Sequence, residues 1–236
     1  MSEQAKDWVS FWNSAHSIYV NARHLDAHYR DIATAIIRLL PRPDARILDY
    51  GCGEAIHAGM IADKAARLLL CDASESVRTN LASRFAGERK ITVLAPEEAE
   101  QLEDASFDLI VTNSVAQYLS STELDRLLAS WRRLLSPGGV LVVGDVIPPH
   151  VGPLQDATSL LRYAAARGFL LPAIAGLIRT AVSPYRKLRN ALGVSLYSEA
   201  QFLQKLTAAG FSAERLPRNL EHNQMRMSFR ARPAER

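Results

Sequence analysis

The stretch that most constrains the fold of this chain is "ILDYGCGEAIHAG", residues 47–59. A short apolar run ends in an acid, two glycines follow with one residue between them, and a segment of helical composition comes next. A glycine pair after a strand allows a sharp turn and lets a ligand approach the backbone closely. The stretch therefore predicts a strand, a ligand-binding loop and a helix, as at the carboxyl edge of an open α/β sheet.

Strand-like and helix-like segments alternate through the middle of the chain. We expect strands at 46–50, 68–71, 91–95, 107–113 and 140–146, helices at 54–68, 74–86 and 121–136, and a turn at 136–139. The third helix has a capping box formed by Ser120 and Glu123. This alternation predicts βαβ units and a mostly parallel sheet, and the apolar strands indicate burial on both faces.

The flanking segments differ from this middle part. We expect helices within 8–40, two or three helices in 154–192 that are interrupted at Pro172 and at "SPY" (183–185), a helix at 197–211, and an antiparallel strand pair at 212–217 and 225–232. The interpretation is a single domain, 1–236, with an N-terminal helical cap at 1–40 and a helical lid insertion at 150–195.

Composition excludes several classes of protein. The chain is 48% hydrophobic and 22% charged, which is ordinary for a globular protein, and no run of about 20 uncharged apolar residues could span a bilayer. The N-terminus lacks the features of a signal peptide, and Cys52 and Cys71 are too few for a disulfide framework, so we expect a cytoplasmic protein. Residues 1–149 carry a net charge of −5 and residues 150–236 one of +8, which favours a local anionic partner over general nucleic-acid binding.

The glycine loop itself limits the ligand. A dinucleotide fingerprint needs a third glycine at position 56, which is Ile56, so a nucleoside without a pyrophosphate is favoured. Asp72 closes the second strand about 20 residues later, where an acid can accept hydrogen bonds from ribose hydroxyls. Two alternatives stay open: Asp49 could cap loop amides, and Asp72 could be the N-cap of the next helix.

Four segments, in order, carry a resemblance to a known family: "ILDYGCGEA", "LLCDAS", "FDLIVTNSVAQYL" and "LLSPGGVLVVGD". Over roughly residues 40–147 the chain resembles class I S-adenosylmethionine-dependent methyltransferases, especially those acting on small molecules and lipid quinones. The resemblance implies an α/β, Rossmann-like, doubly wound, mostly parallel seven-stranded sheet with an antiparallel last strand. It also implies S-adenosylmethionine as cofactor and S-adenosylhomocysteine as product.

The resemblance also assigns positions in the cofactor site. It implies contacts with the methionine part, the ribose, the adenine and the sulfonium from Asp49, Gly51, Cys52, Gly53, Asp72, Ala73, Pro96, Glu97, Asn113, Ser114, Val115 and Tyr118. Pro96 departs from the family pattern, which more often has an acid directly after a small residue. Tyr118 could instead be a core aromatic, and Cys52 is expected to be a small filler without a redox role.

The variable segments suggest the methyl acceptor. The loop after the fourth strand lacks the Asn/Asp-Pro-Pro-aromatic run of nucleobase amine methylases, and no cysteine is placed as a nucleophile, so we expect no nucleic-acid partner. The uncharged segment 168–178 precedes Arg179 and further basic residues, which predicts an apolar or lipid-like small-molecule acceptor, with or without an anionic group. Methyl transfer from the sulfonium of the implied cofactor is an in-line displacement. A peripheral membrane contact through 168–192 is a second interpretation, and helices that simply cover one another are a third.

Candidate catalytic residues are Tyr19, His28 and His150. Tyr19 and His28 belong to the aromatic and histidine-rich stretch 8–33, which in relatives of this family folds over the cofactor, and His24 is a further candidate base there. His150 follows the fifth predicted strand. His57 and His222 receive no role, and we expect no metal site.

The sequence is compatible with two other functions. A methyltransferase-like scaffold or partner subunit could bind the cofactor without turnover, because no obligatory catalytic residue is identifiable. A nicotinamide-dependent oxidoreductase is disfavoured by Ile56 and by the lack of a Tyr-x-x-x-Lys pair. The sequence predicts neither the oligomeric state nor the accepting atom.

Overall fold

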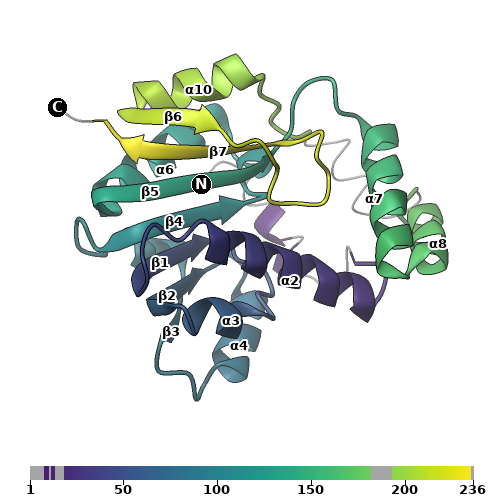
Figure 1. Ribbon diagram of the computed structural model, residues 1–236, viewed down its shortest axis with the longest axis horizontal. Helices are drawn as coiled ribbons and strands as arrows, with labels where there is room; N and C mark the ends of the chain where they lie inside the picture. The colour runs from purple at the N-terminus through teal and green to yellow at the C-terminus, as the bar shows by residue number, and fades with distance from the viewer. Residues whose placement is uncertain (1–7, 11, 14–18, 182–192, 235–236) are drawn as a thin grey trace.

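The structure, a computed structural model, describes residues 8–10, 12–13, 19–181 and 193–234 (Figure 1). Seven strands form one sheet in the order β3-β2-β1-β4-β5-β7-β6. The strands are β1 Ala45–Tyr50, β2 Ala65–Cys71, β3 Ile91–Leu94, β4 Phe107–Asn113, β5 Leu135–Val146, β6 Phe211–Arg215 and β7 Met227–Pro233. β1 to β5 are parallel, whereas β7 is antiparallel to both β5 and β6. The predicted fold class is confirmed.

Helices cover both faces of this sheet. They are α2 Ala22–Arg38, α3 Ala58–Ala62, α4 Glu75–Arg84, α5 Pro96–Ala99, the 3₁₀ helix η1 Ala116–Tyr118, α6 Ser121–Leu134, α7 Pro153–Arg167, α8 Leu170–Ala181 and α10 Glu199–Ala208. α7 and α8 lie beyond the carboxyl ends of the parallel strands, at the right of Figure 1. Among the described helices, none is long and apolar enough to cross a bilayer.

Alternating strand residues build two cores, one on each face. In β2, Leu69 belongs to the cluster that contains Trp131 of α6 and Phe202 of α10. Its neighbour Leu68 belongs to the opposite cluster, with Ile36 of α2. Because successive side chains of a strand point to opposite faces, an almost wholly apolar strand is buried on both sides.

The helix predicted at 54–68 is much shorter in the structure. Only Ala58–Ala62 is helical, because Ala55 adopts a left-handed φ of 36° and β2 already begins at Ala65. The segment from Ala65 pairs with β1 instead. Sheet pairing has overridden the helical preference of an alanine-rich segment.

The predicted turn at 136–139 lies within the bounds of β5. Leu135 pairs with Phe107 and Val140 pairs with Leu109, so the residues between them form an irregularity of the ladder. Gly138 takes a left-handed φ of 77° there. The prolyl and glycyl residues bend the strand rather than precede it.

The predicted break at Pro172 is also displaced. α7 ends at Arg167, and the next residue, Gly168, has the left-handed conformation common after a helix C-terminus, with φ 75°. Pro172 lies in the first turn of α8, where the missing N–H has no helical acceptor to lose. The predicted break at 183–185 lies outside the described residues.

Candidate active site

A cavity of about 710 Å³ opens at the carboxyl edge of the sheet. Its walls come from the N-terminal segment, α2, the loops after β1, β2, β3 and β4, the end of β5, α7, and the loop 216–226 between β6 and β7. Open α/β sheets bind ligands at this edge. All the cofactor residues predicted from the sequence line the cavity: Asp49, Gly51, Cys52, Gly53, Asp72, Ala73, Pro96, Glu97, Asn113, Ser114, Val115 and Tyr118.

The glycine loop after β1 turns tightly across the end of β2. The backbone amides of Gly51 and Cys52 both donate to the carbonyl of Cys71, at 2.7 and 3.1 Å. Gly51 and Gly53 have φ values of 76° and 58°. A Cβ on Gly51 would lie 2.2 Å from Cγ2 of Val115, so a larger residue there would collide with the protein as well as narrow the cavity.

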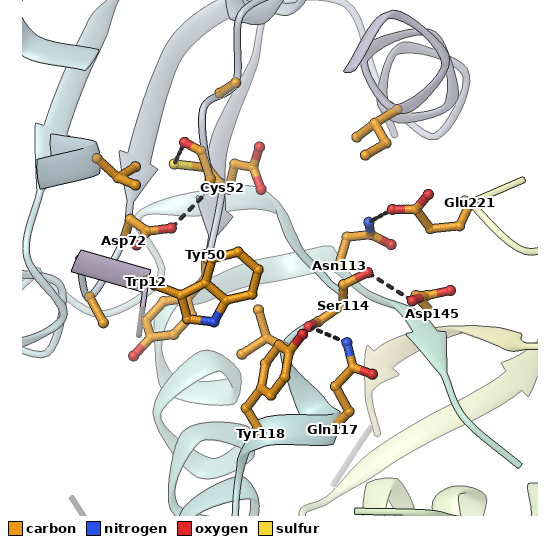
Figure 2. A pocket seen from close by; sticks show the side chains of 18 of the residues that line it. Trp12, Tyr50, Cys52, Asp72, Asn113, Ser114, Gln117, Tyr118, Asp145 and Glu221 are labelled. Atoms are coloured by element: carbon orange, nitrogen blue, oxygen red, sulfur yellow. Dashed lines mark hydrogen bonds between the residues drawn. The ribbon is translucent and has the colours of Figure 1, made fainter. Parts of the chain in front are cut away.

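Asp72 is held in a fixed orientation at the end of β2. Its Oδ2 accepts from the amide of Gly53 at 2.9 Å (Figure 2). Its Oδ1 accepts from the amide of Ser74, also at 2.9 Å. The N-cap of α4 is Ser74, so Asp72 is not that cap. Each carboxylate oxygen keeps a free lone pair that can accept from a ligand hydroxyl.

Asp49 is buried without a hydrogen-bond or ion-pair partner among the described residues. It is 7% exposed and lines the cavity. Burial, with a smaller contribution from the charge of Asp72, raises the pKa of Asp49 to about 7. A buried carboxylate without a cation is costly unless a ligand supplies the positive charge. This part of the cavity therefore fits a cationic group, such as the ammonium and sulfonium of S-adenosylmethionine.

The N-terminal segment covers the cavity on the side of β2 and β4. The indole rings of Trp8 and Trp12 have centroids 4.6 and 5.9 Å from the ring of Tyr118. The Ser74 hydroxyl donates to the side chain of Asn13 at 2.8 Å. Figure 2 shows Trp12, Tyr118 and Tyr50 as an aromatic wall beside Asp72. These contacts close over the predicted cofactor position.

The ends of β4 and β5 carry two residues in strained backbone conformations. Ser114 and Asp145 have φ values of 58° and 62°, and neither is a glycine. The Ser114 hydroxyl donates to Oδ2 of Asp145 at 2.8 Å, which joins the two strand ends (Figure 2). Left-handed non-glycine residues concentrate at functional sites.

The loop 216–226 brings a buried acid to the same place. Glu221 accepts from Nδ2 of Asn113 at 2.9 Å through Oε1, and its Oε2 lies 3.2 Å from Nδ1 of His28 on α2. Burial alone would lower the pKa of His28, but Glu221 raises it above its ordinary value. Burial would raise the pKa of Glu221, but the charge of His28 holds it well below its ordinary range. His28 and Glu221 are thus a buried pair in which each group favours the charged form of the other.

A second charged network ties this loop to α7. Arg226 contacts Oδ2 of Asp145 and Oδ2 of Asp156, the latter at 2.9 Å. Nδ2 of Asn223 donates to Asp156 at 2.8 Å, and Asn219 donates to Asp145 at 3.0 Å. Burial would lower the pKa of Arg226, but the two carboxylates raise it further above its usual value. The guanidinium remains charged and clamps the strand end, the loop and α7 together.

Aromatic and imidazole rings complete this half of the cavity. The ring centroid of Tyr19 lies 5.4 Å from that of His24 and 5.1 Å from that of His28. Burial, helped by the charges of His28 and His222, lowers the pKa of His24 to about 4, so its imidazole is neutral. Burial raises the pKa of Tyr19 well above 10, so its hydroxyl keeps its proton.

α7 is pinned to α2 by one carboxylate. The Tyr163 hydroxyl donates to Oδ2 of Asp31 at 2.9 Å, and the guanidinium of Arg167 contacts the same carboxylate. Nη1 of Arg23 donates to the carbonyl of Gly168 at 3.0 Å. The segment predicted to be a lid is therefore held over the cavity where it is described.

The structure brings Tyr19 and His28 into the cavity but not His150, which is exposed and does not line it. Sequence reasoning gave no role to His222, and it did not consider Glu221. β6 runs parallel to β5, so the loop after β6 must lie at the carboxyl edge of the sheet. The "LEHNQ" stretch between the two predicted last strands was the available signal.

Residues 48–143 match a family of methyltransferase domains. Together with the sheet order, this match identifies that part of the chain as a methyltransferase domain of the class I type, whose cofactor is S-adenosylmethionine.

Trans-aconitate 2-methyltransferase of Streptomyces avermitilis is 33% identical over 126 residues, covering 50% of this chain and 46% of that protein. Malonyl-[acyl-carrier protein] O-methyltransferase of Methylococcus capsulatus is 33% identical over 140 residues, covering 58% of this chain and 50% of that protein. The chain thus spans about half the length of these curated relatives.

Solved structures share the fold over more of the chain. A DhpI complex with S-adenosylhomocysteine matches with a TM-score of 0.60 at 18% identity, covering 100% of both chains. An S-adenosylmethionine-dependent methyltransferase from Mesorhizobium loti matches with a TM-score of 0.56 at 22% identity, covering 85% of this chain and 97% of that one. At these identities the comparison supports the architecture alone.

Proposed function

We propose that this chain transfers a methyl group from S-adenosylmethionine to a small-molecule acceptor. One observation carries the proposal: a single cavity joins two chemically different halves. The cofactor half holds Asp49, Asp72 and the glycine loop, and the histidine half holds His28 and Glu221. Asn113 and Ser114 lie where the halves meet, which is where the family pattern expects the sulfonium.

In the cofactor half, the roles follow from charge and hydrogen-bonding capacity. Asp72 would accept the ribose hydroxyls, because two backbone amides already fix both of its oxygens in place. Asp49 would face the cationic part of the cofactor. The cofactor supplies a methyl group on a positively charged sulfur, and the protein supplies alignment and exclusion of water.

In the histidine half, the described groups favour positioning over proton removal. Nδ1 of His28 is already engaged by Glu221, and the Tyr19 hydroxyl remains protonated, so neither group is placed to remove a proton from an acceptor. His24 is neutral and is the weaker alternative base. We therefore propose in-line displacement driven mainly by orientation, with an acceptor that is already nucleophilic at neutral pH.

The acceptor class is a further part of the proposal. The names of the two curated relatives specify trans-aconitate, an anion, and a malonyl group on a carrier protein. Leu160 of α7 adds an apolar wall to the cavity, and Leu171 and Ile178 of α8 are exposed at 78% and 69%. These features support an acceptor with an apolar body and an anionic or polar end. They also leave a lipid-like acceptor or a peripheral membrane contact as variants of the same proposal.

Calorimetry with S-adenosylhomocysteine, with NADH as a parallel control, tests the cofactor part. We expect binding of the first and none of the second. Turnover is then measured as S-adenosylhomocysteine release with carboxylic acids, phenols, quinones and anionic lipids as acceptors. Cofactor binding without turnover on any of them would favour the scaffold alternative, and binding of neither ligand would contradict the proposal.

A further inference from the structure

Three potential metal ligands from distant parts of the chain meet in the histidine half of the cavity. They are His28 on α2 and the adjacent pair Glu221 and His222 in the loop 216–226. One ligand atom from each lies within 4.8 Å of the other two. All three residues line the cavity. Within the described part of the chain, this is the one such group of three.

The distances fit a common ion. Nδ1 of His28 and Nδ1 of His222 lie 3.2 and 3.7 Å from the same carboxylate oxygen, Oε2 of Glu221. Metal–ligand bonds of about 2.1 Å separate neighbouring ligand atoms by about 3.0 Å in octahedral and about 3.4 Å in tetrahedral geometry. The third separation, between the ligand atoms of the two imidazoles, is at most 4.8 Å, so the two rings would move closer together when an ion binds.

The nitrogen of His222 that faces Glu221 is not hydrogen-bonded within the described part of the chain. This atom, Nδ1, is buried, and Oε2 of Glu221 at 3.7 Å is beyond hydrogen-bond distance. A buried imidazole nitrogen without a partner costs free energy, so it calls for an explanation. The ring is held by stacking on Tyr163 of α7, with centroids 4.7 Å apart and planes 18° apart. The nitrogen is therefore aimed by packing and not by a protein hydrogen bond.

Glu221 is oriented in the way that metal-binding carboxylates usually are. Its other oxygen, Oε1, accepts from Nδ2 of Asn113 at 2.9 Å (Figure 2). The Asn113 side chain fits only because Gly144 lacks a Cβ, which would lie 2.3 Å from Oδ1 of Asn113. An outer hydrogen bond that fixes a carboxylate leaves its second oxygen available to an ion.

We propose that His28, Glu221 and His222 bind one divalent first-row transition metal ion, with its remaining coordination positions facing the cavity. Two imidazoles and one carboxylate suit Zn²⁺, Fe²⁺ or Co²⁺ rather than Mg²⁺ or Ca²⁺. This inference reverses the expectation, drawn from the sequence, of a protein without a metal.

A metal ion in this site would contribute positive charge to the acceptor half of the proposed reaction. The described cations of this half are already matched, because Arg226 contacts Asp145 and Asp156. An ion at His28, Glu221 and His222 would add the positive charge that an anionic or oxygen-bearing acceptor needs. Only this acceptor step depends on the proposed function, and metal binding itself does not.

The test uses full-length protein without a histidine tag, stripped with a chelator and titrated with Zn²⁺, Co²⁺ or Mg²⁺ by calorimetry. Visible absorption reports the geometry around bound Co²⁺. We expect one equivalent of Zn²⁺ or Co²⁺ and no binding of Mg²⁺. His222→Gln should weaken Zn²⁺ binding at least tenfold, whereas His150→Gln, the same change at an exposed histidine outside the cavity, should leave it unchanged.

A second variant and a second ligand distinguish loss of the metal site from unfolding and from failure of the proposed function. Glu221→Gln should also weaken Zn²⁺ binding at least tenfold, and thermal unfolding establishes that each variant is folded. Absence of stoichiometric Zn²⁺ and Co²⁺ binding to the wild type, or equal affinity in His222→Gln, would overturn the metal site. Binding of S-adenosylhomocysteine by the same samples is measured separately, so a failed metal site is distinguishable from a failed methyltransferase proposal.

Discussion

Each end of the central sheet contains a buried carboxylate, and the two carboxylates differ in their hydrogen-bond partners. At the amino end of β4, Asp108 accepts from Nη2 of Arg42 at 2.9 Å, from Arg46 and from the Ser136 hydroxyl at 3.0 Å. Burial would raise the pKa of Asp108, but these hydrogen bonds hold it well below its usual range. At the carboxyl end of β1, Asp49 has no such partner among the described residues, and its pKa is raised to about 7.

This difference separates stability from function. At the amino edge Asp108 is paired with Arg42 and Arg46, so it stabilises the folded state without a ligand. The carboxyl edge keeps Asp49, a buried acid without a cation partner among the described residues. Such a group costs free energy in the free protein and is retained where a bound ligand offsets that cost.

The sharpest test of this contrast is Asp49→Asn. The folded pKa of Asp49 lies above its unfolded value of about 4, so the wild type loses stability as pH rises from about 4 through about 7. At pH 8 the ligand-free variant should be more stable than the wild type, by up to about 4 kcal/mol. Urea unfolding at pH 5 and pH 8 measures this, with the exposed Asp63→Asn as control. If the free energy of unfolding depends on pH equally in the variant and the wild type, Asp49 is not a buried acid with a raised pKa.

Asp72→Ala should weaken binding of S-adenosylhomocysteine by at least about 100-fold, or about 2.7 kcal/mol. The free energy of unfolding should fall by only about 1–2 kcal/mol, because the amides of Gly53 and Ser74 lose their acceptor. Calorimetry gives the affinity, and Asp63→Ala is the matched control. Undiminished affinity would show that Asp72 does not contact the cofactor.

Asp108→Asn should lower the free energy of unfolding by about 2 kcal/mol at pH 7. The folded pKa of Asp108 is depressed, so its contribution is present above its unfolded pKa of about 4 and is lost as pH falls below that value. The difference between variant and wild type should therefore shrink toward pH 3. Calorimetry should show unchanged affinity for S-adenosylhomocysteine, and a loss of affinity would mean that the two edges are not independent.

The smallest effect is expected at Asp31, which joins α2 to α7. Asp31→Asn should cost about 0.5–1 kcal/mol of stability, because its contacts to Tyr163 and Arg167 are partly exposed. Cofactor affinity should not change, while KM for an acceptor found in the screen should rise a few-fold. A change in cofactor affinity with constant KM would contradict the assignment of α7 to the acceptor side.

The predicted elements were most accurate where the signal is local. Ser120 and Glu123 begin α6 as a capping box, as expected, with the Ser120 amide 3.1 Å from Oε2 of Glu123. The helix predicted at 54–68 was wrong outside Ala58–Ala62, because Ala55 is left-handed and pairing with β1 decides where β2 begins. His150 follows β5 as its position predicts, yet the chain turns it to the surface.

By itself, the sequence determined the strand alternation, the glycine turn and the placement of Asp49 and Asp72 at the ends of β1 and β2. These features depend on residues close together in the chain, whose periodicity and backbone freedom act locally. Only the tertiary structure decided that Glu221 meets Asn113, 108 positions away, and His28 on α2. Such contacts depend on how helices and loops pack over the sheet edge, and no local pattern encodes that geometry.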